Sequence, residues 1–190
     1  MPIIKSEDLE EGAVKNVVEI MAASARTAPK TMGIDTLETA VLIGKEKDRL
    51  AKAMEEKGSK KKHPLPFFKR DADNVRNSLC VLLIGVTGTR PKKPETPLNC
   101  GACGFDTCAE LIAAEKKVGE DFTGPLCIWN CIDLGIALGS AVKTASNFNI
   151  DNRVMYSIGA VVKELNLLQS DLILGIPLSI KGKNIFYDRK

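Results

Sequence analysis

Five cysteines lie close together in the second half of this chain, and they constrain it more than any other feature of its sequence. The segment Cys100-Gly-Ala-Cys103-Gly-Phe-Asp-Thr-Cys108 places three thiols within nine residues, and Cys127 and Cys131 follow. Thiolates are soft ligands that suit zinc or iron–sulfur clusters, and four cysteines are the usual ligands of a cluster. Glycines directly after the first two cysteines let the backbone bend closely around an inorganic core. The spacing therefore predicts a 4Fe–4S cluster.

Other interpretations of the cysteines remain open. A structural zinc site usually contains two separated Cys-x-x-Cys pairs, whereas this segment contains one, from Cys100 to Cys103. Disulfide bonds need an oxidising compartment, and the polar start of the chain, from Met1 to Asp8, does not have the pattern of a signal peptide. A sixth cysteine, Cys80, lies in a predicted strand and is interpreted as a small buried hydrophobic residue. We favour the cluster and expect a cytoplasmic protein.

Composition and charge argue against several classes of function. Hydrophobic residues make up 44% of the chain and charged residues 27%, as in ordinary globular proteins. The formal net charge of +3 is too small to indicate nucleic-acid binding, and aromatic residues are scarce. The longest apolar run, residues 132–142, is too short to span a bilayer. We therefore expect neither a nucleic-acid nor a membrane partner.

Basic residues are dispersed apart from two short runs. Lys60-Lys61-Lys62 and Lys92-Lys93 are interpreted as parts of solvated linkers, because short basic runs are common on loops. The single histidine, His63, follows the first run, and a histidine-based catalytic triad is not expected from that position. No other residue is predicted to be catalytic, so whether the chain is an enzyme stays open.

Apolar periodicity predicts helices and strands on both sides of the cysteines. An apolar stripe predicts a first helix that Ser6 caps and that ends near Arg26. The other predicted helices cover residues 45–57, 67–77, 132–145 and 158–166, and the predicted strands cover 38–43, 79–84, 154–157 and 171–180. We expect the 38–43 strand to be buried. The 132–145 helix is apolar on almost all sides, so we expect it to be buried as well.

The cysteines lie in a segment that differs in composition from its surroundings. Three prolines between Thr87 and Asn99 predict an extended connector before them, and Gly124-Pro125 marks a second change after them. We interpret residues 95–131 as a small iron–sulfur module. It is inserted into an α+β body made of residues 1–94 and 132–190.

The Cys-x2-Cys-Gly-x3-Cys-Ala-Glu pattern that begins at Cys100 resembles the small iron–sulfur domain of certain electron-transport subunits. In that family the fourth ligand follows a short helix, expected here at residues 109–117. The cluster ligands that the resemblance implies are Cys100, Cys103, Cys108 and Cys127. The interval before Cys127 is a few residues longer than in the family, so Cys131 remains the alternative. Trp129, between these two cysteines, is expected to shield the cluster from water.

The body resembles the flavin-dependent nitroreductase fold. The turn Ala25-Arg26-Thr27-Ala28-Pro29-Lys30 and the closing Leu174-Gly175-Ile176-Pro177 before a basic tail carry this resemblance. It implies a homodimer that binds FMN across its two-fold interface. The implied flavin contacts are Arg26, Lys30 and Gly33 at the turn and Lys181, Lys183 and Arg189 in the tail. Arg and Lys suit the FMN phosphate, although surface solvation or ion pairs are the other interpretation of these cations.

Body and module together resemble a prokaryotic family of uncharacterised ferredoxin-domain proteins. The first hypothesis is a cytoplasmic redox protein that passes electrons between the cluster and FMN, to a small-molecule or protein acceptor. Two departures from the nitroreductase pattern leave an alternative open. The Arg-rich segment before the first helix is missing, and Gly33-Ile34-Asp35 replaces an Asn/Gln pair. The alternative is a flavin-free electron carrier or redox sensor that docks on a partner protein.

Overall fold

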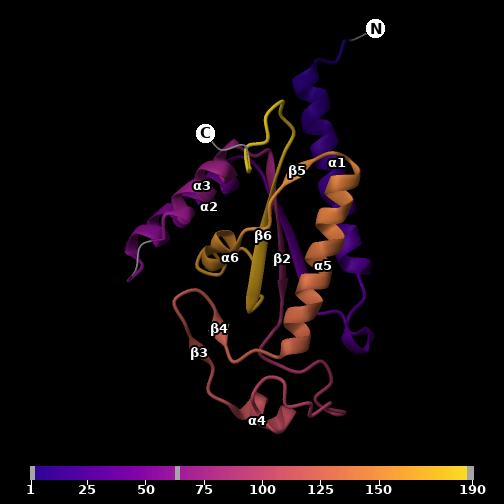
Figure 1. Ribbon diagram of the computed structural model, residues 1–190, viewed down its shortest axis with the longest axis vertical. Helices are drawn as coiled ribbons and strands as arrows, with labels where there is room; N and C mark the ends of the chain where they lie inside the picture. Colours follow the sequence, from indigo (N-terminus) through magenta and orange to yellow (C-terminus); the bar gives the residue numbers. More distant parts are fainter. Residues whose placement is uncertain (1–2, 63–64, 188–190) are drawn as a thin grey trace.

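The computed structural model describes residues 3–62 and 65–187, so His63 and Arg189 lie outside the described residues. A four-stranded antiparallel sheet forms its centre, in the order β1-β2-β6-β5 (Figure 1). The strands are β1 (Leu37–Leu42), β2 (Cys80–Val86), β5 (Asp151–Asn152) and β6 (Leu172–Ser179). In the central pair, Cys80 lies opposite Leu178 and Val86 opposite Leu172. We call the end of the sheet at Val86 the module end, because the cysteine module, residues 95–131, follows it, and we call the end of the sheet at Cys80 the far end.

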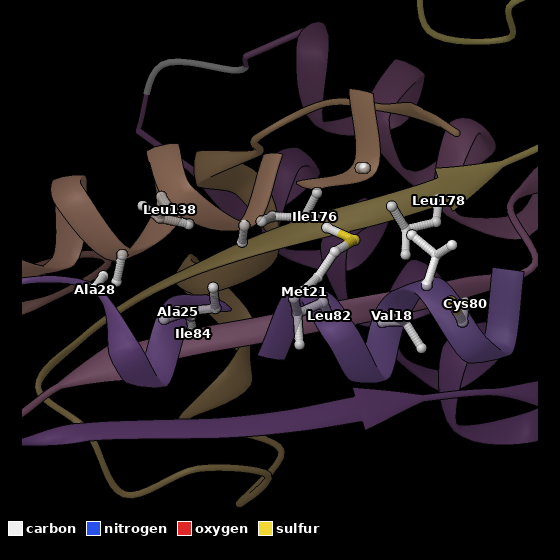
Figure 2. Packing of buried hydrophobic residues seen from close by; sticks show 14 of the residues in the cluster. Val18, Met21, Ala25, Ala28, Cys80, Leu82, Ile84, Leu138, Ile176 and Leu178 are labelled. Carbon is white, nitrogen blue, oxygen red and sulfur yellow. The ribbon is translucent and has the colours of Figure 1, made fainter. Parts of the chain in front are cut away.

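Helices cover both faces of this sheet. On one face lie α1 (Ser6–Thr27) and α5 (Ile128–Asn147), and on the other lie α2 (Gly44–Lys60), α3 (Phe67–Asn77) and α6 (Tyr156–Val162). Successive side chains of a strand point to opposite faces. Leu82 and Ile84 of β2 therefore pack under α1 and α5, as Figure 2 shows, while Leu83 packs under the opposite helices. No helix in the described ranges is long and apolar enough to cross a membrane.

Several predicted elements are confirmed closely. The 67–77 helix is α3, and the strands at 79–84 and 171–180 are β2 and β6 with shifts of one or two residues at their ends. The prediction that Ser6 caps the first helix was wrong, because Lys5 occupies the N-cap position and makes no side-chain capping bond. The burial predicted for strand 38–43 was also wrong. Strand β1 pairs only with β2 at the edge of the sheet, and Val41 is exposed.

Other predictions failed in the second half of the body. The predicted strand at 154–157 reduces to a single bridge between Met155 and Gly175, because α6 begins at Tyr156. Helix α5 is longer than predicted and is not buried on most sides. Its neighbours are α1 and the sheet, which leave an outer side where Ile132 and Ile136 are each 41% exposed.

The cysteine module lies beyond the module end of the sheet (Figure 1). Residues 87–99 form a connector without helix or strand, but it is not extended throughout as predicted, because the chain turns at residues 93–96, where the backbone nitrogen of Thr96 donates to the Lys93 carbonyl. The module then contains α4 (Cys108–Ala113) and a hairpin of β3 (Lys117–Val118) and β4 (Thr123–Gly124). The predicted helix at 109–117 was too long. Helix α4 ends at Ala113, since the chain there turns into β3 and Lys116 donates a hydrogen bond to the Leu111 carbonyl.

Candidate metal centre

Four cysteines from separate parts of the module line one pocket. They are Cys100, Cys103, Cys108 and Cys127, the four that the resemblance to electron-transport subunits implied. Cys131 is not among the residues that line this pocket. Most of the other lining side chains are apolar, and they include Met32, Leu98, Phe105, Leu111 and Ile128. A thiol-lined pocket with apolar walls limits solvent access, which is one of the factors that set the potential of an iron–sulfur cluster.

Left-handed backbone shapes the loop that carries the first three cysteines. Asn99, Gly101 and Gly104 have φ angles of 45°, 72° and 86°. The two glycines each follow a cysteine directly, and glycine adopts this conformation without the cost that a Cβ atom imposes. The Oδ1 atom of Asn99 accepts a hydrogen bond from the backbone nitrogen of Cys108 at 2.8 Å. This bond joins the start of the loop to its end and closes the loop around the pocket.

Cys100 is the exposed member of the four, and it receives hydrogen bonds. The indole Nε1 of Trp129 lies 3.3 Å from its Sγ atom and donates to it. The backbone N–H of Ala102 first, and then this indole, lower the pKa of the Cys100 thiol. The donors therefore favour the thiolate, which is the form that binds metals. Trp129 also lines the pocket.

Cys127 and Cys131 differ in their position relative to the pocket. Cys127 is buried at the N-cap of α5, and its backbone nitrogen donates to the carbonyl of Gly88 at 2.8 Å. Cys131 lies one turn further along α5 and is half-buried. Burial, and then the neighbouring Cys127, raise the pKa of the Cys131 thiol. These positions favour Cys127 over Cys131 as the fourth ligand.

The four thiols do not form a compact single-ion site among the described residues. Within residues 3–62 and 65–187, no three His, Cys, Asp or Glu side chains gather closely enough to hold a single metal ion. In a four-cysteine zinc site each sulfur lies about 2.3 Å from the metal, so the sulfurs are within ~4 Å of one another. All six cysteines lie in the described part of the chain and are free of disulfide bonds.

A buried ion pair joins this pocket to the body. Lys92 Nζ lies 2.8 Å from Asp133 Oδ2, and the two side chains are 2% and 1% exposed. Lys92 also donates to the Ile34 carbonyl and to Thr36 Oγ1. Asp133 Oδ1 accepts from both the backbone nitrogen and the hydroxyl of Thr31, each at 2.9 Å. Since Lys92 and Thr31 line the cysteine pocket, the pair holds connector, pocket and α5 in one arrangement.

A second ion pair fastens the β3–β4 hairpin to the body. Lys61 Nζ lies 2.6 Å from Asp121 Oδ2, with the side chains 4% and 8% exposed, and the hydroxyl of Tyr156 donates to the same oxygen. Burial acts to raise the pKa of Asp121, but the hydrogen bonds from Lys61 and Tyr156 outweigh it, and the pKa is lowered. The interpretation of both lysine runs as solvated linkers was therefore wrong for Lys61 and Lys92, because each has a buried carboxylate partner.

The cations at the turn after α1 already contact protein groups. Arg26 Nη1 lies 2.5 Å from Asp35 Oδ2 and donates to the Leu37 carbonyl at 2.9 Å. Lys30 Nζ donates to three carbonyls at the end of α1, those of Ala25, Arg26 and Ala28. Gly33 is exposed and left-handed, with φ of 67°, in the short 3-10 helix η1 (Thr31–Gly33). These three residues lie near the module end.

The tail cations lie elsewhere. Lys181 and Lys183 are exposed and follow β6 at the far end of the sheet. The central strands pair over seven residues, which corresponds to about 23 Å. Within one chain the structure therefore does not bring the turn and tail cations together as a single flavin site.

Two comparisons relate the sequence to other proteins. Residues 123–189 match a family described as "Uncharacterized protein containing a ferredoxin domain (DUF2148)". That stretch contains Cys127 and Cys131 but not the three earlier cysteines. An uncharacterized protein of Archaeoglobus fulgidus is 44% identical over 189 residues, which cover 98% of this chain and 97% of the relative.

Solved structures of nitroreductases share the fold. A nitroreductase with bound FMN from Desulfitobacterium hafniense aligns with a TM-score of 0.56 at 11% identity, covering 96% of this chain and 81% of that one. Nitroreductase CinD from Lactococcus lactis, in complex with chloramphenicol, aligns with a TM-score of 0.55 at 14% identity, covering 92% and 84%. At such identities the similarity shows the fold alone. It confirms the predicted nitroreductase-like α+β architecture.

Proposed function

We propose that this chain, which belongs to the family of uncharacterised proteins containing a ferredoxin domain, is a cytoplasmic redox protein that holds one 4Fe–4S cluster. One observation carries the proposal: Cys100, Cys103, Cys108 and Cys127 line a single pocket with mostly apolar walls. Four thiolates are the usual ligands of such a cluster, which supplies one-electron transfer when bound. The six free thiols support a reducing compartment.

The chain's own residues have distinct parts in this proposal. The four thiols bind, the apolar walls exclude water, and the pair of Lys92 and Asp133 fixes the pocket on the body. Cys127 stands at the N-cap of α5, a helix of twenty residues. The positive end of a helix dipole favours negative charge nearby, so the N-terminus of α5 would favour the anionic thiolate of Cys127 and the negative charge of a cluster held there.

We further propose FMN as the redox partner of the cluster, in a homodimer. The nitroreductase-like fold supports this, and so does the position of Thr31 and Met32. Both line the cysteine pocket, and both follow directly on the turn where the resemblance places flavin contacts. Because the tail cations lie at the far end in one chain, the resemblance requires a second copy to bring them to the flavin.

A second candidate is a flavin-free electron carrier or redox sensor that docks on another protein. The contacts of Arg26 and Lys30 favour it specifically. Their charged groups are engaged by Asp35 and by carbonyls of α1, and a flavin phosphate would have to compete with these partners.

Anaerobic purification tests the proposals, with iron, sulfide, zinc and released flavin measured on one sample. About four irons and four sulfides per chain are expected, together with one FMN. A full cluster without FMN, even after FMN is added, would favour the carrier or sensor. One zinc per chain without sulfide would contradict the cluster itself. The Cys80→Ala variant is a matched control, since Cys80 lies in β2, away from the pocket, and its loss should leave the iron content unchanged.

A further inference from the structure

We propose that Trp129 is a positioning residue for the cluster ligand Cys100, and that its indole N–H raises the reduction potential of the site. This inference rests on the proposed 4Fe–4S cluster. The proposed role of Trp129 goes beyond shielding the cluster from water. The rise in reduction potential is assigned to the hydrogen bond from the indole N–H, and not to the volume of the ring.

A hydrogen bond from Trp129 to Cys100 joins the two ends of the module. Cys100 opens the cysteine loop and is exposed, so packing constrains its thiol less than that of the buried Cys127. Trp129 lies in the first turn of α5, two residues after Cys127, and its Nε1 atom is 3.3 Å from Cys100 Sγ. The indole nitrogen can only donate. It therefore holds the outer ligand against the helix that carries the inner one.

The sign of the effect follows from charge. Reduction adds one negative charge to a cluster, and part of that charge resides on its sulfur ligands. A hydrogen bond donated to such a sulfur is stronger when the sulfur is more negative, so it stabilises the reduced form more than the oxidised form. Removing the donor should shift the reduction potential to more negative values.

Two substitutions separate the hydrogen bond from shielding. Trp129→Phe keeps an aromatic ring and removes the N–H, and Trp129→Leu removes both. The potential is measured by a redox titration followed by electron paramagnetic resonance, on the anaerobically reconstituted full chain. We expect a more negative potential for Trp129→Phe than for the wild type. Trp129→Leu also admits water, which favours the more highly charged reduced form, so its potential should lie above that of Trp129→Phe.

A second readout uses the wild-type chain. Trp129 is the single tryptophan of the sequence, so the intrinsic tryptophan fluorescence comes from this site alone. Reconstitution with iron and sulfide should quench this emission, whereas the same treatment of Cys103→Ala should not.

The outcomes distinguish the two proposals. Failure of the wild type to take up iron and sulfide would overturn the proposed function and this inference with it. Normal uptake with equal potentials in the wild type and Trp129→Phe would overturn this inference alone. Uptake without quenching of the tryptophan emission would overturn it as well, since the indole would then lie away from the cluster.

Discussion

Cys127 and Cys131 are a matched pair at the scale of single residues, since they lie one turn apart on the same helix. Only Cys127 lines the pocket. We expect Cys127→Ala to lose most of the iron of the anaerobically purified protein, because a cluster then lacks its fourth thiolate. Cys131→Ala should keep the wild-type iron and sulfide content. The reverse pattern would identify Cys131 as the ligand.

The buried carboxylate of Asp133 gives a second prediction for a single residue. Asp133→Asn leaves the Lys92 ammonium buried without its counter-charge, and breaking such a pair costs about 3–5 kcal/mol of unfolding free energy. Urea denaturation of the purified protein measures this loss. Glu11→Gln is the control, since Glu11 pairs with Lys15 on the surface and such pairs contribute ~1 kcal/mol or less. If Asp133→Asn and Glu11→Gln lost the same unfolding free energy, a structural role for Asp133 would be contradicted.

At the scale of elements, the contact between α6 and β6 depends on a glycine. A Cβ atom on Gly159 of α6 would lie 1.7 Å from the carbonyl oxygen of Ile173 in β6, whereas one on Gly135 of α5 would have no atom within 4 Å. Gly159→Ala should therefore lower the unfolding free energy by about 1–3 kcal/mol or more, as overpacking does. Gly135→Ala should raise it by up to ~1 kcal/mol, because alanine is the better helix former. Thermal unfolding of the two variants checks the opposite signs.

Elements with a strong local pattern were predictable, and those that depend on distant contacts were not. The central strand β2 is a continuous apolar run, and α3 has a clear periodicity, so both were placed within two residues. Helix α6 packs closely on β6 at Gly159, and no local pattern reveals this approach. No local pattern around Lys92, which follows Pro91, predicts that its side chain is buried. A signal did exist in Asp133, a carboxylate inside an apolar helix, because a buried charge needs a partner.

At the scale of the whole molecule, one apolar side of α5 is partly exposed. Ile128, Ile132 and Ile136 follow one another at intervals of four residues and are 37%, 41% and 41% exposed. If the proposed homodimer forms through this side, the double substitution Ile132→Lys and Ile136→Lys should convert it to monomers. Light scattering coupled to size-exclusion chromatography measures the mass. Val118→Lys on the hairpin, 83% exposed, is the control and should not change the mass. An unchanged mass in the double variant would place any interface elsewhere.

The pocket is lined by thiols from both ends of the stretch between Cys100 and Cys127, and this has a consequence for how the stretch would respond to the loss of a bound group. A group bound by Cys100 and Cys127 cross-links the chain across the whole stretch between them. By the chain-entropy relation for cross-links, closing a loop of this length is equivalent to about 3–4 kcal/mol. If the proposed cluster were lost, that restraint would be lost with it, while the pair of Lys92 and Asp133 would still hold the connector to α5 and the pair of Lys61 and Asp121 would still hold the hairpin. Loss of the cluster should therefore make the loop that carries Cys100, Cys103 and Cys108 more susceptible to proteases, while the body stays folded.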